Sequence, residues 1–255
     1  MYLGIISRLV PQGYMVVTIG APHESVFTVY PDGGFIKQAR EIAEIESTDY
    51  ASWHRLLENR VQMIILVMDY LETLNRFDPE LKGLFDLDKV TAIGHSLGGA
   101  AVLEATRRNK RIKGSILLDP SFHLIRRDNE RSSVPVLLLR QEASTYQEMA
   151  ASMNETIARD YIDGQRYAFT HLQNSLFYRV NGAQHMSFSD VPLHYNDFHA
   201  IQTQAATVGI ATAFIKSVIH SGHTPATAAL QHSVAVVLIN ADGEPIWTER
   251  NSEID

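Results

Sequence analysis

The sequence has 255 residues, of which 45% are hydrophobic and 20% charged, so it is long enough for one large core and is neither disordered nor collagen-like in composition. Its formal net charge of −7 argues against a nucleic-acid-binding surface, and the basic residues at 107–111 are explained by compensation of a helix dipole. The absence of cysteine excludes disulfides, thiolate metal sites and a cysteine nucleophile.

Two segments bear on membranes and export. The most apolar run, residues 63–68, stops at Asp69 and is far too short to span a membrane. Residues 1–10 lack the charged n-region and the small-residue cleavage site of a signal peptide. We therefore expect no transmembrane segment, and the sequence carries no visible export signal that would assign a compartment.

The first part of the chain predicts a helix, a strand and a long helix. Residues 3–9 read as a helix, and the apolar run at 14–19 predicts a fully buried strand of the parallel kind. A loop is expected over residues 21–34. Thr48 and Asp49 supply N-capping side chains for the long helix. Its apolar stripe is assigned to the core and consists of Trp53, Leu57, Val61, Ile64, Met68 and Leu71.

Strands alternate with helices through the middle of the chain. The strands are expected at residues 90–93, 114–118, 134–139 and 176–180. The helices are expected at residues 97–107, about 145–160 and about 205–220. Because each strand is apolar on both faces, this order predicts a doubly wound, mostly parallel α/β sheet with helices on both faces.

The tail has a different character. Two apolar runs, residues 234–239 and 246–248, flank the turn at 240–243 and predict a C-terminal β-hairpin. We expect residues 1–255 to form a single domain, with residues 232–255 as its hairpin tail.

A serine motif lies between an expected strand and an expected helix, and it reads Gly94-His95-Ser96-Leu97-Gly98. A sharp strand–turn–helix elbow exposes a serine hydroxyl to a base that removes its proton. Gly94 and Gly98 are expected because a side chain there would collide with the neighbouring strand and helix. Ser96 is therefore the predicted nucleophile, and the Leu97 N–H is a predicted donor to the oxyanion.

A serine nucleophile needs an imidazole within hydrogen-bond reach. His185 follows the last parallel strand and precedes the last helix, and loops at the carboxyl ends of strands carry such groups. His95 is next to Ser96 in sequence but faces the wrong way across the turn. His185 is therefore the predicted base.

Two carboxylates are candidates for orienting the histidine. Asp119 ends one strand and precedes a proline that restricts its backbone, and Glu142 follows the next strand. Either keeps the order nucleophile, acid, histidine. Glu142 is close to Arg140 in sequence and could simply pair with it, so strand-end placement favours Asp119 and leaves Glu142 as the alternative.

Two groupings of histidines have spacings that suggest metal ligands, namely His194 with Asp197 and His199, and His220 with His223. Neither pair of histidines has a third ligand at a matching spacing. We interpret them as surface histidines and expect neither a metal nor another cofactor.

The sequence resembles the platelet-activating-factor acetylhydrolase group of α/β-hydrolases and, more distantly, cutinase-like polyester hydrolases. The resembling segments are residues 67–75, 93–100, 116–122 and 185–192. The resemblance covers most of residues 13–221 and implies an α/β-hydrolase fold. It also implies that the acid follows the strand after the nucleophile helix, as Asp119 does, and that short or oxidised acyl esters are hydrolysed without a metal.

The resemblance also implies a difference at the N-terminus. Members of the group carry three strands, and a loop that donates the second oxyanion N–H, before the segment that corresponds to residue 1 here. The sheet is therefore expected to be N-terminally shortened, and the sequence identifies no second donor. An unpaired sheet edge would favour homo-oligomers, unless the tail hairpin covers it.

These observations predict a serine carboxylic-ester hydrolase that acts on small-molecule esters with short-chain or oxidised acyl groups through an acyl-enzyme intermediate. Two alternatives remain open. One is a catalytically impaired hydrolase-fold protein that binds a ligand, since fold alone does not fix function. The other is an acyltransferase that uses the same triad.

Overall fold

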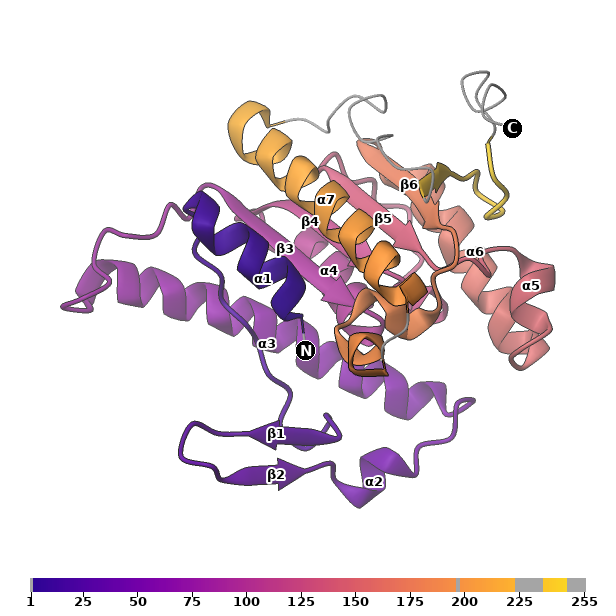
Figure 1. Ribbon diagram of the computed structural model, residues 1–255, viewed down its shortest axis with the longest axis horizontal. Coiled ribbons are helices and arrows are strands. Elements are labelled where there is room, and N and C mark those ends of the chain that lie inside the picture. Colours follow the sequence, from indigo (N-terminus) through magenta and orange to yellow (C-terminus); the bar gives the residue numbers. More distant parts are fainter. Residues whose placement is uncertain (1, 196–197, 223–235, 247–255) are drawn as a thin grey trace.

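The centre of the fold is a sheet whose strands follow the chain in order, as Figure 1 shows. The computed structural model describes residues 2–195, 198–222 and 236–246. Within them the sheet consists of β3 (Val90–His95), β4 (Ile112–Leu118), β5 (Val136–Arg140), β6 (Ser175–Val180) and β7 (Val236–Leu238). Strands β3 to β6 are parallel, and β7 pairs antiparallel with β6. The carboxyl ends of β3, β4 and β5 therefore meet at one end of the sheet.

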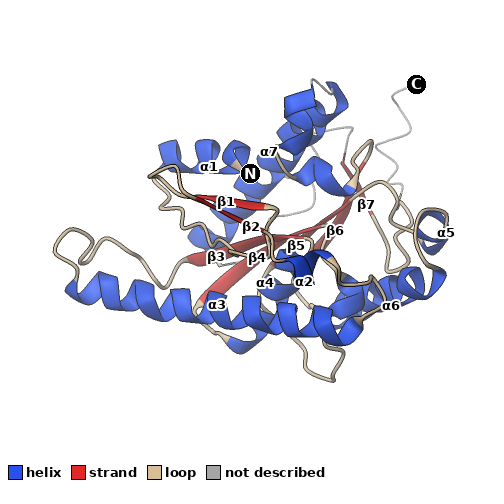
Figure 2. Ribbon diagram, turned by 90° about the horizontal axis from the view of Figure 1, so that it is seen from below, coloured by secondary structure: helices blue, strands red, loops and turns tan. Residues whose placement is uncertain are grey.

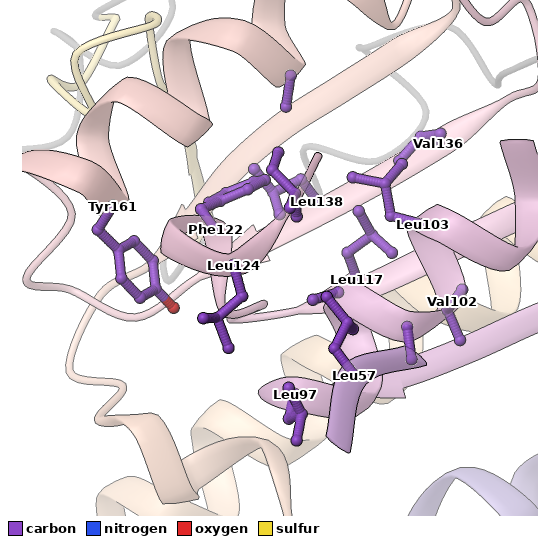
Figure 3. Close-up of a cluster of buried hydrophobic side chains, with 14 of the residues drawn as sticks. Leu57, Leu97, Val102, Leu103, Leu117, Phe122, Leu124, Val136, Leu138 and Tyr161 are labelled. Atoms are coloured by element: carbon purple, nitrogen blue, oxygen red, sulfur yellow. The ribbon is translucent and has the colours of Figure 1, made fainter. Parts of the chain in front are cut away.

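Helices cover both faces of this sheet, as predicted (Figure 2). One face is covered by α3 (Tyr50–Phe77), α4 (Leu97–Arg108) and α6 (Glu155–His171). The other is covered by α1 (Leu3–Leu9) and α7 (Phe198–Ser221). Figure 3 shows the cluster on the first face, where Leu103 of α4 lies near Leu117 and Leu138 of the sheet. Each such leucine contributes roughly 1.5–3 kcal/mol through burial, so the sheet is a stable platform for the loops at its end.

The long helix α3 begins as its capping residues predict. The Asp49 carboxylate accepts the Ser52 N–H at 3.1 Å, which satisfies one of the free N–H groups of the first turn. Leu57, Val61 and Met68 of the predicted stripe are buried. The spacing of apolar residues alone was therefore sufficient to identify the face that meets the core.

The prediction of a buried strand at 14–19 is wrong. These residues have no ladder partner in the described part of the chain. Tyr14 and Val16 pack against the core, whereas Met15, Val17 and Ile19 are exposed. The run is apolar except for Thr18, and its residues from Val17 to Ile19 are all exposed, so only its first part packs against the protein.

Two other expected segments differ in detail. The loop expected at 21–34 contains β1 (Phe27–Val29), which pairs antiparallel with β2 (Phe35–Lys37). The helix expected at 145–160 is two helices, α5 (Tyr146–Ala150) and α6. The break has a local cause, because the Asn154 side chain accepts the N–H groups of Thr156 and Ile157 and starts a new helix.

Short helical turns complete the description. They are η1 (Val10–Gln12), α2 (Arg40–Ala43), η2 (Phe122–Leu124), η3 (His185–Phe188) and η4 (Val191–Tyr195). No helix in the described ranges has the length and apolar character needed to cross a membrane.

The described part of the tail is an antiparallel turn against the sheet. Strand β7 is followed by a turn that an isolated bridge between Ile239 and Pro245 closes. Residues 234–235 and 247–248 of the two predicted runs lie outside the described residues. The tail thus extends the sheet beyond β6, at the edge opposite β3.

Candidate active site

Ser96 lies in a strained turn between β3 and α4. Its backbone has φ 57° and ψ −126°, a conformation that a residue with a side chain rarely adopts. The Ser96 N–H donates to the Leu118 carbonyl at 3.0 Å, which fixes the turn against the end of β4. The hydroxyl is therefore held at the carboxyl end of the sheet, where a strand–serine–helix elbow presents a nucleophile.

The tight turn depends on two glycines, of which only one was predicted. A Cβ at Gly94 would lie 2.2 Å from the Gly98 carbonyl oxygen, and a Cβ at Gly99 would lie 2.9 Å from the Pro120 Cβ. At Gly98 the nearest neighbour would be Arg60 Nη1, at 3.9 Å. The prediction of a collision at Gly98 is therefore wrong, because the close approach between strand and helix falls one residue later.

His185 lies between the serine and a carboxylate. The Ser96 hydroxyl and His185 Nε2 are 3.0 Å apart, and His185 Nδ1 and Asp119 Oδ2 are 2.6 Å apart. With Nδ1–H donating to the carboxylate, Nε2 is free to accept the serine proton. The turn that carries His185 is braced by the Gln184 N–H, which donates to Ser187 Oγ at 3.0 Å.

Asp119 is almost completely buried, at 1% exposure, whereas the His185 side chain is 40% exposed. The second oxygen of the carboxylate, Oδ1, accepts Arg140 Nε–H at 2.9 Å and the Gln141 N–H at 3.3 Å. Burial opposes ionisation, but the Arg140 charge and the hydrogen bonds from His185 and Gln141 hold the pKa of Asp119 below its ordinary value. Asp119 is therefore a carboxylate at neutral pH, and its backbone has a positive φ of 40°.

Glu142, the alternative acid, lies elsewhere. Its side chain is exposed, and its carboxylate accepts the Gly182 N–H at 3.2 Å. The suggested pairing of Glu142 with Arg140 is wrong, because the Arg140 guanidinium is buried and bound to Asp119. Sequence proximity misled here: Asp119 directly follows β4 and Arg140 ends the neighbouring strand β5, so the two meet although they are far apart in the chain.

His95 has a role that the sequence did not indicate. Its Nε2 lies 2.9 Å from the His185 carbonyl oxygen, and its Nδ1 lies 2.9 Å from the Tyr2 hydroxyl. These partners assign Nε2–H as the donor and Nδ1 as the acceptor. Burial and the neighbouring His185 lower the pKa of His95 to about 4, so the ring is neutral at neutral pH. Only the folded loop, which places the His185 carbonyl beside β3, reveals this contact.

Leu97 is the first residue of α4, and its N–H has no hydrogen-bond partner among the residues that the structure describes. The first N–H groups of a helix lack intrahelical acceptors and attract negative charge. The group is therefore available beside Ser96 for an oxyanion.

A surface depression of about 690 Å³ lies at the opposite end of the sheet. Its lining includes Lys89, Ile112 and Pro135, at or just before the amino ends of β3, β4 and β5. It is therefore separate from Ser96.

As for metals, no three potential ligands come together in the described ranges, and the side chains of Asp197, His199 and His223 fall outside them.

Comparisons with known proteins bear on the fold and the family. A family model described as platelet-activating factor acetylhydrolase, isoform II, matches residues 61–203, a range that includes Ser96, Asp119 and His185. A search of curated protein sequences finds no match. Among solved structures, the chain is similar to a ferulic acid esterase from Streptomyces cinnamoneus, with a TM-score of 0.70 and 21% sequence identity. The similarity covers 93% of this chain and 68% of that one, and it shows a shared α/β-hydrolase fold.

Proposed function

We propose that Ser96, His185 and Asp119 are the catalytic residues of this chain. The chain belongs to the platelet-activating factor acetylhydrolase isoform II family and is a serine carboxylic ester hydrolase. The observation that carries the proposal is the continuous set of hydrogen bonds from the Ser96 hydroxyl through the His185 ring to Asp119, with distances of 3.0 and 2.6 Å. Such contacts are the geometric requirement for activating a serine.

The proposed reaction passes through an acyl-enzyme. Ser96 Oγ attacks the ester carbonyl carbon while His185 Nε2 takes the hydroxyl proton, and the same proton then passes to the departing alcohol. Water, deprotonated by His185, releases the acid and restores the serine. Asp119 stabilises the imidazolium, and the Leu97 N–H donates to the oxyanion.

The proposed substrates are esters of short-chain or oxidised acyl groups. The family membership supports this class, since it points to acetylhydrolase activity. The proposed chemistry assigns every proton transfer to His185 and requires no metal ion or organic cofactor. Transfer of the acyl group to an alcohol or amine would use the same three residues, so the acceptor has to be identified from the products.

A fluorophosphonate probe tests the proposal directly, because it reacts only with an activated serine. We expect a single labelled peptide that contains Ser96, and we expect release of free acid from p-nitrophenyl acetate or butyrate. Ser96→Ala should abolish labelling and lower turnover by about a thousand-fold or more, with little change in the melting temperature. Labelling at another serine, or a mutant with nearly normal turnover, would contradict the assignment.

A further inference from the structure

Arg140 is a fully buried cation next to the proposed acid. It ends β5, has 0% exposure, and its Nε–H donates to Asp119 Oδ1 at 2.9 Å. A buried charge is costly unless it is paired and hydrogen-bonded. The proposed reaction assigns Arg140 no part, although its partner oxygen belongs to the carboxylate that orients His185.

The remaining donors of Arg140 are held by α5 and α6. Nη1–H donates to Gln165 Oε1 at 2.6 Å, and Nη2 lies 3.4 Å from the Met149 sulfur. The guanidinium also lies over the Tyr161 ring, 4.8 Å from its centroid, a favourable position for a cation. The guanidinium is therefore held by α5 and α6 as well as by Asp119.

The network continues into the C-terminal turn. Gln165 Nε2–H donates to the Ala241 carbonyl at 3.1 Å, and Ser144 Oγ–H donates to the Gly243 carbonyl at 2.7 Å. Gln165 and Ser144 are both fully buried. A chain of hydrogen bonds thus joins the turn after β7 to Arg140, and Arg140 to Asp119.

We propose that Arg140 is a positioning residue for the hydrolytic reaction, which holds the Asp119 carboxylate so that Oδ2 faces His185 and partly compensates its negative charge. The proposal rests on the proposed function of Asp119 and His185. Two separate effects follow from it. The Nε–H bond from the held guanidinium to Oδ1 fixes the orientation of the carboxylate, and the Arg140 charge weakens the attraction of Asp119 for an imidazolium.

The second effect predicts a pH dependence that a purely structural ion pair would not produce. Removing the Arg140 charge leaves the Asp119 carboxylate uncompensated beside the His185 ring, so the rising limb of kcat/KM against pH should move to higher pH. Two other titratable groups near Asp119 and His185 have pKa values far from neutral pH. The pKa of His95 is lowered to about 4, and burial raises the pKa of Tyr161 above its ordinary value.

Two substitutions separate charge from orientation. Arg140→Gln removes the charge but keeps a donor for Asp119, and the midpoint of the rising limb of kcat/KM against pH should move up by about one unit. Arg140→Lys keeps the charge but loses the guanidinium that bonds Asp119 and Gln165 at the same time, so the midpoint should stay in place while kcat falls about ten-fold. Both variants keep a polar group in the site, and their melting temperatures report whether they fold.

Arg166→Gln is the matched control. Arg166 lies on α6, is 53% exposed and pairs with Asp242 at 2.6 Å, so the same change in charge occurs near the same turn but in solvent. Its pH profile should match that of the wild type. If Arg140→Gln shows the wild-type midpoint, the charge effect is wrong. If Arg140→Lys keeps the wild-type kcat, the orientation effect is wrong. Should Arg140→Gln not fold, the kcat of Arg140→Lys tests the positioning role without it.

The rate of fluorophosphonate labelling, measured over the same pH range, separates this inference from the proposed function. A wild type that is neither labelled nor active would overturn both. A wild type that is labelled at Ser96, with Arg140 variants that match it in midpoint and rate, would overturn the positioning role alone.

Discussion

Two of the three described residues other than glycine that have positive φ belong to the proposed catalytic set. Among the described residues other than glycine, His23, Ser96 and Asp119 have positive φ. Such conformations cost roughly 1–3 kcal/mol each and persist only where the surroundings impose them. The bond from the Ser96 N–H to Leu118 and the bond from the Asp119 N–H to Leu139, at 3.0 and 2.7 Å, impose the two turns. The strain of these two turns thus lies where the catalytic side chains must meet.

At the scale of single residues, the two carboxylates make opposite predictions. Asp119→Asn should lower kcat about ten-thousand-fold, because the amide cannot hold the His185 tautomer that accepts the serine proton. Glu142→Gln should change kcat by less than about ten-fold, because the Glu142 carboxylate accepts the Gly182 N–H, whereas the His185 ring is bonded to Asp119. Steady-state kinetics on p-nitrophenyl butyrate measures both, and the reverse ranking would assign the acid role to Glu142.

At the scale of elements, the C-terminal turn is fitted closely to the rest of the fold. Gly243 has φ +82°, and a Cβ on it would lie 1.9 Å from the Ser144 carbonyl oxygen. The backbone of one turn therefore rests directly on the backbone that precedes α5. Because Ser144 and Gln165 bind this turn, its placement affects the elements that enclose Arg140.

The substitution Gly243→Ala tests this contact. It should lower the free energy of unfolding by about 3 kcal/mol or more, since the left-handed backbone costs roughly 1–2 kcal/mol and the collision adds to it. Gly13→Ala is the control: Gly13 has a similar φ of +86° with nothing within 4 Å of the added Cβ, so only the backbone cost should appear. Equal losses for the two variants in urea titrations would show that the contact is loose.

At the scale of the whole molecule, the two edges of the sheet differ. On the side of β6 the sheet is extended by β7, whereas β3 has a ladder partner on one side only among the described residues. Exposed edges and exposed apolar side chains favour association between chains. The segment at 14–19 adds such side chains, with Met15 52%, Val17 48% and Ile19 43% exposed.

We therefore expect the chain to self-associate, with a mass by light scattering that rises with concentration towards at least twice the mass of one chain. Val17→Lys should lower the associated fraction, because a charge on an exposed apolar segment opposes pairing. Val29→Lys changes an equally apolar side chain, 71% exposed on the separate β1–β2 pair, and should have little effect. A wild type of single-chain mass at all concentrations would exclude this association.

Local sequence determined much of the element pattern and of the candidate site. The capping residue Asp49 and the apolar stripe of α3 located that helix, because both signals depend only on neighbouring residues. The glycine-flanked serine located the turn at Ser96, and strand-end positions selected Asp119 and His185. Each of these signals is short-range, and the carboxyl ends of parallel strands necessarily meet.

Tertiary structure alone decided which partners these residues have. The sequence placed Arg140 near Glu142, but the fold pairs it with Asp119, because neighbouring strands bring residues from distant parts of the chain together. The same holds for His95, whose partners are the His185 carbonyl and Tyr2, and for residues 14–19, which pair with no strand in the described part of the chain. Periodicity and turn chemistry fix an element, whereas the charge balance and burial of a site depend on packing between elements.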